Sequence, residues 1–387
     1  MDCDVVIVGG ALVGTAAARA LAGSGLRLAL LDAAEPPPPP AGPLDCRVYA
    51  ISPGSQALLA ALGAWEALDP ARVAPVERMR VFGDQPDAEL TFSAFDAGRA
   101  ELAWIVEASA IHAALERTLA GQADLAVLRP ERPADLAWTA DGLQLVTAGG
   151  TTLRTRLVIG ADGADSWVRD HAAVAVARRD YGQQGVVAHF RCELPHRGTA
   201  HQWFREDGVL ALLPLPGDQV SMVWSAADAL AEELKAGGDA ALAERVTAAS
   251  GGVLGRMEPV SAPLGFPLRL VKVDALVAPR VALVGDAAHA VHPLAGQGVN
   301  LGFQDVRELA RVLAEREPGR DCGDYPLLRR YERARREDIV LMQTVTDSLQ
   351  RLFGRPEPAL AAARNWGLRL TNTLAPLKSL LMQHALG

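Results

Sequence analysis

A glycine-rich turn near the N-terminus, residues 9–14, places Gly9 and Gly14 at the first and sixth positions of a fingerprint that binds the phosphates of a dinucleotide. The turn follows a β-branched run, Val5–Val8, and precedes an alanine-rich stretch suited to a helix. The third place of the fingerprint, usually a glycine that lets a pyrophosphate approach, is Ala11. Because a helix N-terminus offers free N–H groups and a positive dipole end, this order of elements predicts a dinucleotide site.

An acidic residue closes the next expected strand. Asp32 follows the apolar run Leu28–Leu31, 23 residues after Gly9. A carboxylate at the carboxyl end of that strand can accept hydrogen bonds from ribose hydroxyl groups. The turn and the acid together do not distinguish NAD from FAD, and a glycine-rich turn without a ligand is the structural alternative.

Two later segments narrow the choice of cofactor. The first places Asp162-Gly163 one residue after the apolar run Leu157–Gly160, and the second places Gly285-Asp286 after Val281–Val284. Glycine allows the chain to leave a strand sharply, and each aspartate presents a carboxylate to a hydroxyl-bearing ligand. The stretch that follows, residues 293–298, carries few large side chains, so its backbone can approach a flat ring.

These segments resemble the DG and GD motifs of the flavoprotein aromatic hydroxylases, the class A monooxygenases. The string His292–Gly302, with Arg47-x-x-Ala50-Ile51-Ser52 upstream, is similar to the ubiquinone-biosynthesis hydroxylase family. The resemblance extends from Asp4 to Gly387, and its motifs occur in the family's order and spacing. It implies that NAD(P)H reduces FAD, that O₂ adds at flavin C4a, and that the hydroperoxide hydroxylates an aromatic ring. The implied substrate is a polyprenyl phenol of the ubiquinone pathway.

The resemblance also implies the residues of the site. The helix that starts near Gly298 would direct its dipole at the flavin and stabilise the anion that develops at N1 and C2=O. Arg47 would lie along the FAD phosphates or ribose, and Asp162-Gly163 would serve FAD and help to seat the nicotinamide nucleotide. Pro293 and Gly298 would form the environment of the flavin ring. The expected cofactor-binding residues are Gly9, Gly10, Ala11, Gly14, Asp32, Arg47, Asp162, Gly163, Gly285, Asp286, Pro293, Gly296, Gln297, Gly298, Val299 and Asn300.

The order of elements predicts an α/β fold with a discontinuous, Rossmann-like FAD-binding domain and an inserted β-rich substrate domain. We assign residues 1–75, 101–178 and 267–345 to the first domain, residues 76–100 and 179–266 to the second, and residues 346–387 to a helical C-terminal segment. Expected strands of the second domain are 186–192, 209–214 and 220–225, and residues 226–250 are helical in composition.

Composition excludes several classes of protein. Among 387 residues, 50% are hydrophobic and 22% are charged, which excludes disorder driven by charge. The formal net charge of −8 argues against a nucleic-acid partner, since binding to phosphates needs basic surface. No uncharged run reaches the ~18–20 residues that a membrane-spanning helix requires. The four cysteines are scattered without metal-ligand spacing, so we expect no metal and a reducing cytosol.

The C-terminal tail differs in charge from the rest of the chain. Residues 351–387 hold five basic residues against one acid, and Leu370, Leu374, Leu377 and Leu381 have helical spacing around Pro376. Such a segment suits peripheral contact with the inner face of a membrane, or with a multi-enzyme ubiquinone-biosynthesis complex. A helix that covers the flavin domain is the equal alternative.

Other functions and roles stay open at this level. A hydroxylase of a small soluble phenol would need a polar pocket, for which Arg191 and Arg205 are candidates, and Ala11 leaves room for a non-catalytic FAD-bound scaffold subunit. His289 and His292 invite interpretation as general bases, although the resemblance assigns their segment to the flavin site.

Structural interpretations are favoured for two further groups. An ion pair between Asp165 and Arg169 would fix their loop. Aromatic residues of the second domain are interpreted as core in preference to a substrate-binding surface; they are Phe190, Trp203, Phe204 and Trp224.

Overall fold

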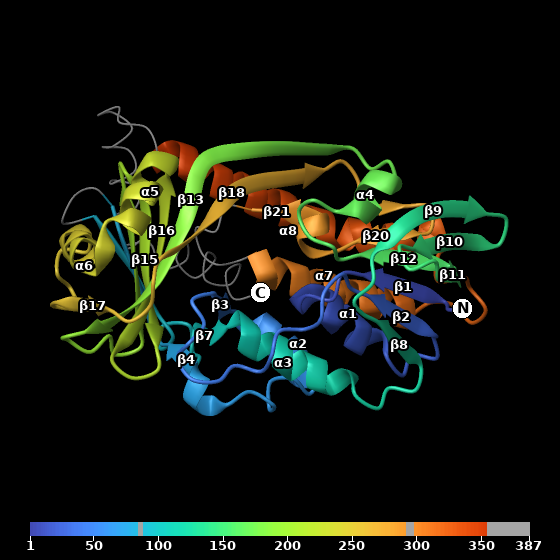
Figure 1. Cartoon of the computed structure of the whole chain (residues 1–387), viewed down its shortest axis with the longest axis horizontal. Coiled ribbons are helices and arrows are strands. Elements are labelled where there is room, and N and C mark those ends of the chain that lie inside the picture. Colours follow the sequence, from blue (N-terminus) through green and yellow to red (C-terminus); the bar gives the residue numbers. More distant parts are fainter. Residues whose placement is uncertain (84–87, 292–297, 354–387) are drawn as a thin grey trace.

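The computed structural model describes residues 1–83, 88–291 and 298–353. The predictions for Pro293, Gly296, Gln297 and His292, and those for the tail beyond residue 353, concern residues outside these ranges. The mixed α/β fold class predicted from the sequence is confirmed (Figure 1).

A six-stranded, mostly parallel sheet forms the centre of the first domain. Its strands run in the order β19 (Val277–Ala278), β20 (Val281–Leu283), β12 (Leu157–Gly160), β1 (Val5–Val8), β2 (Leu28–Leu31) and β8 (Leu125–Leu128), and only β19 is antiparallel. β1, β2 and β12 are buried along their whole length, as expected of strands covered on both faces. The helices of this domain pack in the order α3, α1, α7 and α8; they are α1 (Leu12–Leu21), α3 (Ala108–Leu119), α7 (Gly298–Ala314) and α8 (Tyr325–Phe353).

A nine-stranded sheet forms the second domain. Its strands run in the order β21 (His289–Ala290), β18 (Leu264–Val273), β13 (Val176–Cys192), β16 (Gln219–Ala227), β15 (Gly208–Leu215), β14 (Thr199–Arg205), β5 (Arg78–Phe82) and β6 (Glu89–Ser93), with β17 (Met257–Pro259) paired to β13. Helices α5 (Asp228–Ala236) and α6 (Gly238–Ala249) lie on its outer side, away from the first domain (Figure 1). An apolar core that includes Phe190, Met222 and Trp224 fills the space beneath these helices.

Two small sheets and several short helices complete the fold. One sheet comprises β3 (Val48–Ile51), β7 (Ala103–Glu107) and β4 (Val73–Val76), and the other β9 (Pro133–Thr139), β10 (Gly142–Thr147) and β11 (Thr152–Thr155). The short helices are α2 (Pro53–Ala61), α4 (Trp167–His171) and the 3₁₀ turns Pro70–Arg72 and Gly285–Ala287. An apolar cluster joins the β3–β7–β4 sheet to β15 through Ile105, Leu213 and Leu215, so this small sheet connects the two domains.

Long elements run through the predicted domain boundaries. The boundary at 178/179 falls within β13, the boundary at 266/267 within β18, and the boundary at 345/346 within α8. β13 extends along one side of the molecule from α4 to the large sheet (Figure 1). The expected helical stretch 226–250 is two helices, because Gly238, the second residue after the end of α5, has φ +75°.

Candidate functional site

The three glycine motifs meet at one place in the first domain. A β-carbon on Gly9 would lie 2.4 Å from the carbonyl oxygen of Ala161, directly before the Asp162-Gly163 turn. Val13 of the first turn packs against the second motif, because a β-carbon on Gly302 would lie 2.6 Å from Val13 Cγ2 and one on Gly285 would lie 3.2 Å from Val13 Cγ1. Glycine at these positions therefore permits contacts between backbone segments that are far apart in the sequence.

The N-terminus of α1 is available to a ligand. Its N-cap residue, Ala11, is exposed and makes no side-chain capping bond, so the first N–H groups of α1 receive no side-chain acceptor from the cap. Ala11 has φ −73°, an ordinary value for alanine. The missing third glycine of the fingerprint thus causes no backbone strain in this turn.

A network of polar side chains contacts the carbonyl oxygen of Gly10. Thr15 Oγ1 donates a hydrogen bond of 2.7 Å to this oxygen, and His112 Nε2 lies 2.8 Å from it. Arg129 binds both carboxylate oxygens of Glu116 at 2.8 Å, and His112 Nε2 lies 3.4 Å from Glu116 Oε1. Burial alone would raise the pKa of Glu116, but hydrogen bonds from His112 and Arg129 and the charge of Arg129 lower it to about 2. We call Thr15, His112, Glu116 and Arg129 the Gly10 support network.

Asp32 and Arg129 lie together above Gly10. A β-carbon on Gly10 would lie 2.5 Å from Asp32 Oδ2 and 2.8 Å from Arg129 Nη2, so only glycine leaves room for both side chains. Arg129 Nε is 3.8 Å from Asp32 Oδ2. The predicted ribose-binding carboxylate therefore has a guanidinium group beside it.

Arg47 and Asp286 lie near each other on the side of the site that faces the second domain. The Arg47 guanidinium lies 5.7 Å from the ring centroid of Tyr49 and 5.5 Å from that of Phe266. Asp286 is exposed, yet desolvation by the surrounding protein raises its pKa, while His289 and Arg47 oppose this rise. A carboxylate enclosed by protein but open on one side is suited to accept hydrogen bonds from ligand hydroxyl groups.

The loop that carries Arg47 is held by buried groups. Glu107 Oε1 accepts a hydrogen bond of 2.5 Å from the Asp45 amide, and Arg72 binds both oxygens of Glu107 at 2.6 and 2.7 Å. His189 Nε2, on β13, lies 2.9 Å from the Asp45 carbonyl oxygen. Both domains thus fix the backbone two residues before Arg47.

A buried carboxylate anchors the Gly285-Asp286 turn. Asp305 Oδ2 accepts hydrogen bonds from the Gly285 amide at 3.0 Å and from His289 Nε2 at 2.6 Å, and Asp305 Oδ1 accepts one from Arg335 Nε at 2.8 Å. Burial alone would raise the pKa of Asp305, but His289 and Arg335 hold it below its ordinary value. Asp305 therefore stays ionised and fixes the turn from beneath.

Arg169 connects the two aspartate-bearing motifs. Its side chain is fully buried, and it donates hydrogen bonds to the carbonyl oxygens of Ala164, at 2.9 Å, and Ala287, at 3.0 Å. The predicted ion pair between Asp165 and Arg169 is wrong, because Asp165 pairs with Arg269 at 3.6 Å and Arg169 points inward. The arginine is a structural link between the motifs instead.

Comparisons with known proteins agree with this geometry. A family described as an FAD binding domain matches residues 2–346. Ubiquinone hydroxylase UbiL of Rhodospirillum rubrum is 36% identical, over 99% of this chain and 89% of the relative, and the 3-demethoxyubiquinol 3-hydroxylase of Escherichia coli is 35% identical, over 99% and 98%. The chain belongs to the ubiquinone-biosynthesis hydroxylases, a family of FAD-dependent aromatic monooxygenases.

A solved structure supports the fold of the hydroxylase. The p-nitrophenol 4-monooxygenase PnpA of Pseudomonas putida DLL-E4 superposes with a TM-score of 0.81, covering 100% of this chain and 99% of that one. Since the two sequences are 17% identical, this likeness concerns the fold alone.

The described residues of the hydroxylase fit FAD. Carboxyl oxygens that can accept hydrogen bonds are available at Asp32 and Asp286, and the N-terminus of α1 has no capping side chain. Gly163 has φ +83°, and no protein atom lies within 4 Å of a β-carbon built on it. The site thus offers acceptors for hydroxyl groups and donors for phosphates around an unobstructed backbone.

Two residues that were predicted to bind the cofactor, Asp162 and Asn300, form side-chain hydrogen bonds with other residues of the hydroxylase. Asp162 accepts hydrogen bonds from Ser166 Oγ at 2.5 Å and from the Val168 amide at 3.0 Å, which caps α4. Asn300 accepts one from the Ser52 amide at 3.1 Å and donates one to the Ala50 carbonyl oxygen at 2.8 Å. Any contact of Asp162 or Asn300 with the cofactor therefore has to come mainly from the backbone.

Other candidate residues of the hydroxylase are structural. His289 is fully buried against Asp305, which does not suit a general base that acts on a bound substrate. Phe190 and Trp224 are completely buried in the core beneath α5 and α6, and Phe204 is buried in a second cluster. Trp203 is partly buried and packs against the core that contains Trp224. The interpretation of these aromatic residues as core is confirmed.

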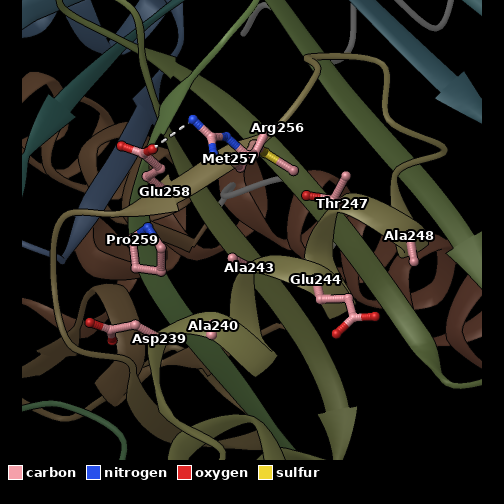
Figure 2. A pocket seen from close by; sticks show the side chains of 10 residues that line it. All are labelled: Asp239, Ala240, Ala243, Glu244, Thr247, Ala248, Arg256, Met257, Glu258 and Pro259. Atoms are coloured by element: carbon pink, nitrogen blue, oxygen red, sulfur yellow. Dashed lines mark ion pairs between the residues drawn. The ribbon is translucent and has the colours of Figure 1, made fainter.

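A groove of about 740 Å³ lies on the outer side of the second domain, between α6 and β17 (Figure 2). Ala243, Thr247 and Met257 lie along it, and an ion pair of 3.2 Å joins Arg256 to Glu258 at its edge. None of its lining residues belongs to a glycine motif, so the groove is separate from the cofactor site.

The described residues contain no group of three histidine, cysteine, aspartate or glutamate side chains arranged to hold a metal ion. None of their helices is both long enough and apolar enough to cross a membrane.

The low pKa of Glu116 predicts a contribution to stability that depends on pH. Because its pKa is about 2 in the folded protein and 4.5 ordinarily, this contribution is complete above about pH 4.5 and disappears as the pH falls toward 2. Glu116→Gln should lower the free energy of unfolding at pH 7 by roughly 3 kcal/mol. Denaturant unfolding should show this deficit shrinking between pH 5 and pH 3. Glu315→Gln, at an exposed ion pair, is the control, and equal deficits at both pH values would contradict the assignment.

Proposed function

We propose that this hydroxylase inserts one oxygen atom of O₂ into the aromatic ring of a polyprenyl phenol in ubiquinone biosynthesis, with NAD(P)H as the electron donor. The observation that carries the proposal is the meeting of the three glycine motifs, in which Gly9 contacts Ala161 and Val13 contacts Gly285 and Gly302. Family membership, with relatives that match 99% of the chain, supports the reaction class, and the activities for which these relatives are named support the pathway.

Different groups of the chain would bind different parts of FAD. When bound, the cofactor would supply the activation of O₂. The N-terminus of α1 would bind the pyrophosphate, and Asp32 would accept hydrogen bonds from the adenosine ribose. Asp286 and Arg47 would bind the central part of the cofactor, where a carboxylate suits hydroxyl groups and a guanidinium suits phosphate. The N-terminus of α7, at Gly298, would face the flavin ring, and Pro293 with Gly298 would form its immediate environment.

Apolar side chains on the inner face of the large sheet favour the proposal of an apolar substrate. On this face, opposite the core beneath α5 and α6, Ala211, Leu213 and Val223 are half-buried. The alternative of a small soluble phenol needs an arginine here. Arg205 instead binds Asp207 on the outer side and lies 5.8 Å from the Trp224 ring, while Arg191 is exposed near the end of β13.

Product analysis tests the proposed function. The purified protein should show flavin absorbance, and a polyprenyl phenol should accelerate its oxidation of NADPH at least several-fold. In a deletion strain, the quinone intermediate that accumulates should lack one hydroxyl group, and it should disappear when the gene is returned. A protein that cannot be loaded with FAD would contradict the proposal. FAD binding without any NAD(P)H oxidation would favour the scaffold alternative.

We infer that the hydroxylase collects its substrate at the inner face of the membrane, through its C-terminus. Two features support this: the basic composition of residues 351–387, and the exposed side chains of Val340, Leu341 and Val345 on the preceding part of α8. Truncation after residue 353 should reduce flotation with anionic vesicles at least fivefold and leave flavin content unchanged. Equal flotation of both proteins would contradict membrane contact, and recovery of the full chain with other pathway enzymes would support a complex instead.

A further inference from the structure

Arg129 presents an unpaired donor inside the predicted adenosine-binding region. Its side chain is 7% exposed, and both terminal nitrogens are engaged by Glu116 at 2.8 Å. A further donor of the same guanidinium, Nε–H, is buried and has no hydrogen-bond partner among the described residues. Leaving a buried donor without a partner is unfavourable, so a ligand that accepts its hydrogen bond would bind more tightly for that reason.

The neighbours of this donor define what it could bind. β2 and β8 are parallel neighbours with Leu31 opposite Leu128, so Asp32 and Arg129 are the next residues at the same edge of the sheet. Both lie over Gly10, whose missing side chain leaves space for Asp32 Oδ2 and Arg129 Nη2. The pair is therefore placed at the turn that would bind the cofactor's phosphates.

The chemistry of the pair matches a sugar hydroxyl group. An ionised carboxylate only accepts hydrogen bonds and a guanidinium only donates them, whereas a hydroxyl group does both. Arg129 Nε and Asp32 Oδ2 are 3.8 Å apart, beyond a good hydrogen bond with each other. One hydroxyl group can donate to Asp32 and accept from Arg129 at the same time.

We propose that Arg129 is a cofactor-binding residue, whose Nε–H donates a hydrogen bond to a ribose hydroxyl oxygen of the adenosine half of FAD while Asp32 accepts a hydrogen bond from the same hydroxyl group. This inference rests on the proposed FAD-binding function. The Gly10 support network then has a second task, since the two hydrogen bonds that Arg129 donates to Glu116 hold its guanidinium with Nε 3.8 Å from Asp32 Oδ2. The structural alternative is that Arg129 serves Asp32 and Glu116 alone and does not touch the ligand.

The preference for a ligand that carries ribose hydroxyl groups distinguishes a cofactor-binding Arg129 from a purely structural one. The probes are ADP and 2′,3′-dideoxy-ADP, titrated by calorimetry into the full chain after removal of FAD. The wild type should bind ADP at least tenfold more tightly than the dideoxy analogue. Arg129→Met should weaken ADP binding about tenfold and leave binding of the dideoxy analogue nearly unchanged. The ratio of the two dissociation constants should therefore fall toward one. Arg129→Lys, which keeps the charge without the fixed fork of donors, should lose most of the ratio as well.

The controls distinguish failure of this inference from failure of the proposed function. Arg154→Met, at an exposed arginine paired with Asp2, should retain the wild-type ratio. The ratio is measured within each variant, so a partly unfolded preparation does not change it. Unchanged discrimination in both Arg129 variants, or none in the wild type, would overturn the role of Arg129. A wild-type chain that binds no FAD would overturn the proposed function itself.

Discussion

Replacing Gly14 with alanine should remove FAD from the purified protein. A β-carbon at this position would lie 1.8 Å from the carbonyl oxygen of Gly9, which is less than any non-bonded approach of real atoms, so the turn and α1 would have to separate. Because Gly9 in turn contacts Ala161, the shift would spread to the Asp162-Gly163 turn. We expect flavin affinity to fall at least 100-fold, measured by fluorescence quenching of FAD. A loss of unfolding free energy of about 2–4 kcal/mol should accompany it.

Ala11→Gly is the matched control for this prediction. It restores the third glycine of the fingerprint at an exposed N-cap position with ordinary backbone angles, where glycine is tolerated. FAD affinity should stay within about threefold of the wild type, since no strain is relieved. A Gly14→Ala protein that retains its flavin would show that the turn is not a cofactor contact. A large gain of affinity in Ala11→Gly would instead show that the methyl group obstructs the phosphates.

The elements that could be predicted from the sequence are those whose formation depends mainly on neighbouring residues. A buried strand, a turn that needs positive φ and a helix start can each be recognised in a short window, and Gly9 has φ +103° as such a turn requires. The expected strand Leu28–Leu31 has the bounds of β2. Pairing between strands that are far apart in the sequence cannot be recognised in this way. The part of β13 before residue 186 carries mostly polar side chains and is a strand because β18 pairs with it, which no window of sequence reveals.

The parts of the site that the sequence did not reveal depend on contacts between distant residues. Arg129 and Glu116 carry no motif, and their meeting beside Asp32 follows from the packing of α3 against α1 and of β8 against β2. Arg169 lies within a recognised segment, but its inward direction depends on the carbonyl oxygen of Ala287. A basic residue directly after an apolar strand at the carboxyl edge of the sheet is the signal that could have indicated Arg129.

The buried carboxylate of Asp305 should be the most sensitive position outside the glycine turns. Asp305→Ala would leave Arg335, His289 and the Gly285 amide without their acceptor, all of them buried. Loss of one partner of a buried ionic network costs about 3–5 kcal/mol. Urea unfolding at pH 7 should show a loss of this size. FAD affinity should also fall, because the Gly285-Asp286 turn would lose its anchor.

The dependence on pH follows from the lowered pKa of Asp305. A carboxyl group whose folded pKa lies below its ordinary value of 3.8 stabilises the protein above that pH, and the effect is lost as the pH falls through the folded pKa. Asp305→Asn should therefore be destabilised at pH 7 and lose less further stability on acidification than the wild type. Asp338→Asn removes an exposed carboxylate 2.7 Å from the same Arg335 and should cost at most about 1 kcal/mol. Equal losses in Asp305→Ala and Asp338→Asn would mean that burial of the network does not govern the stability of this turn.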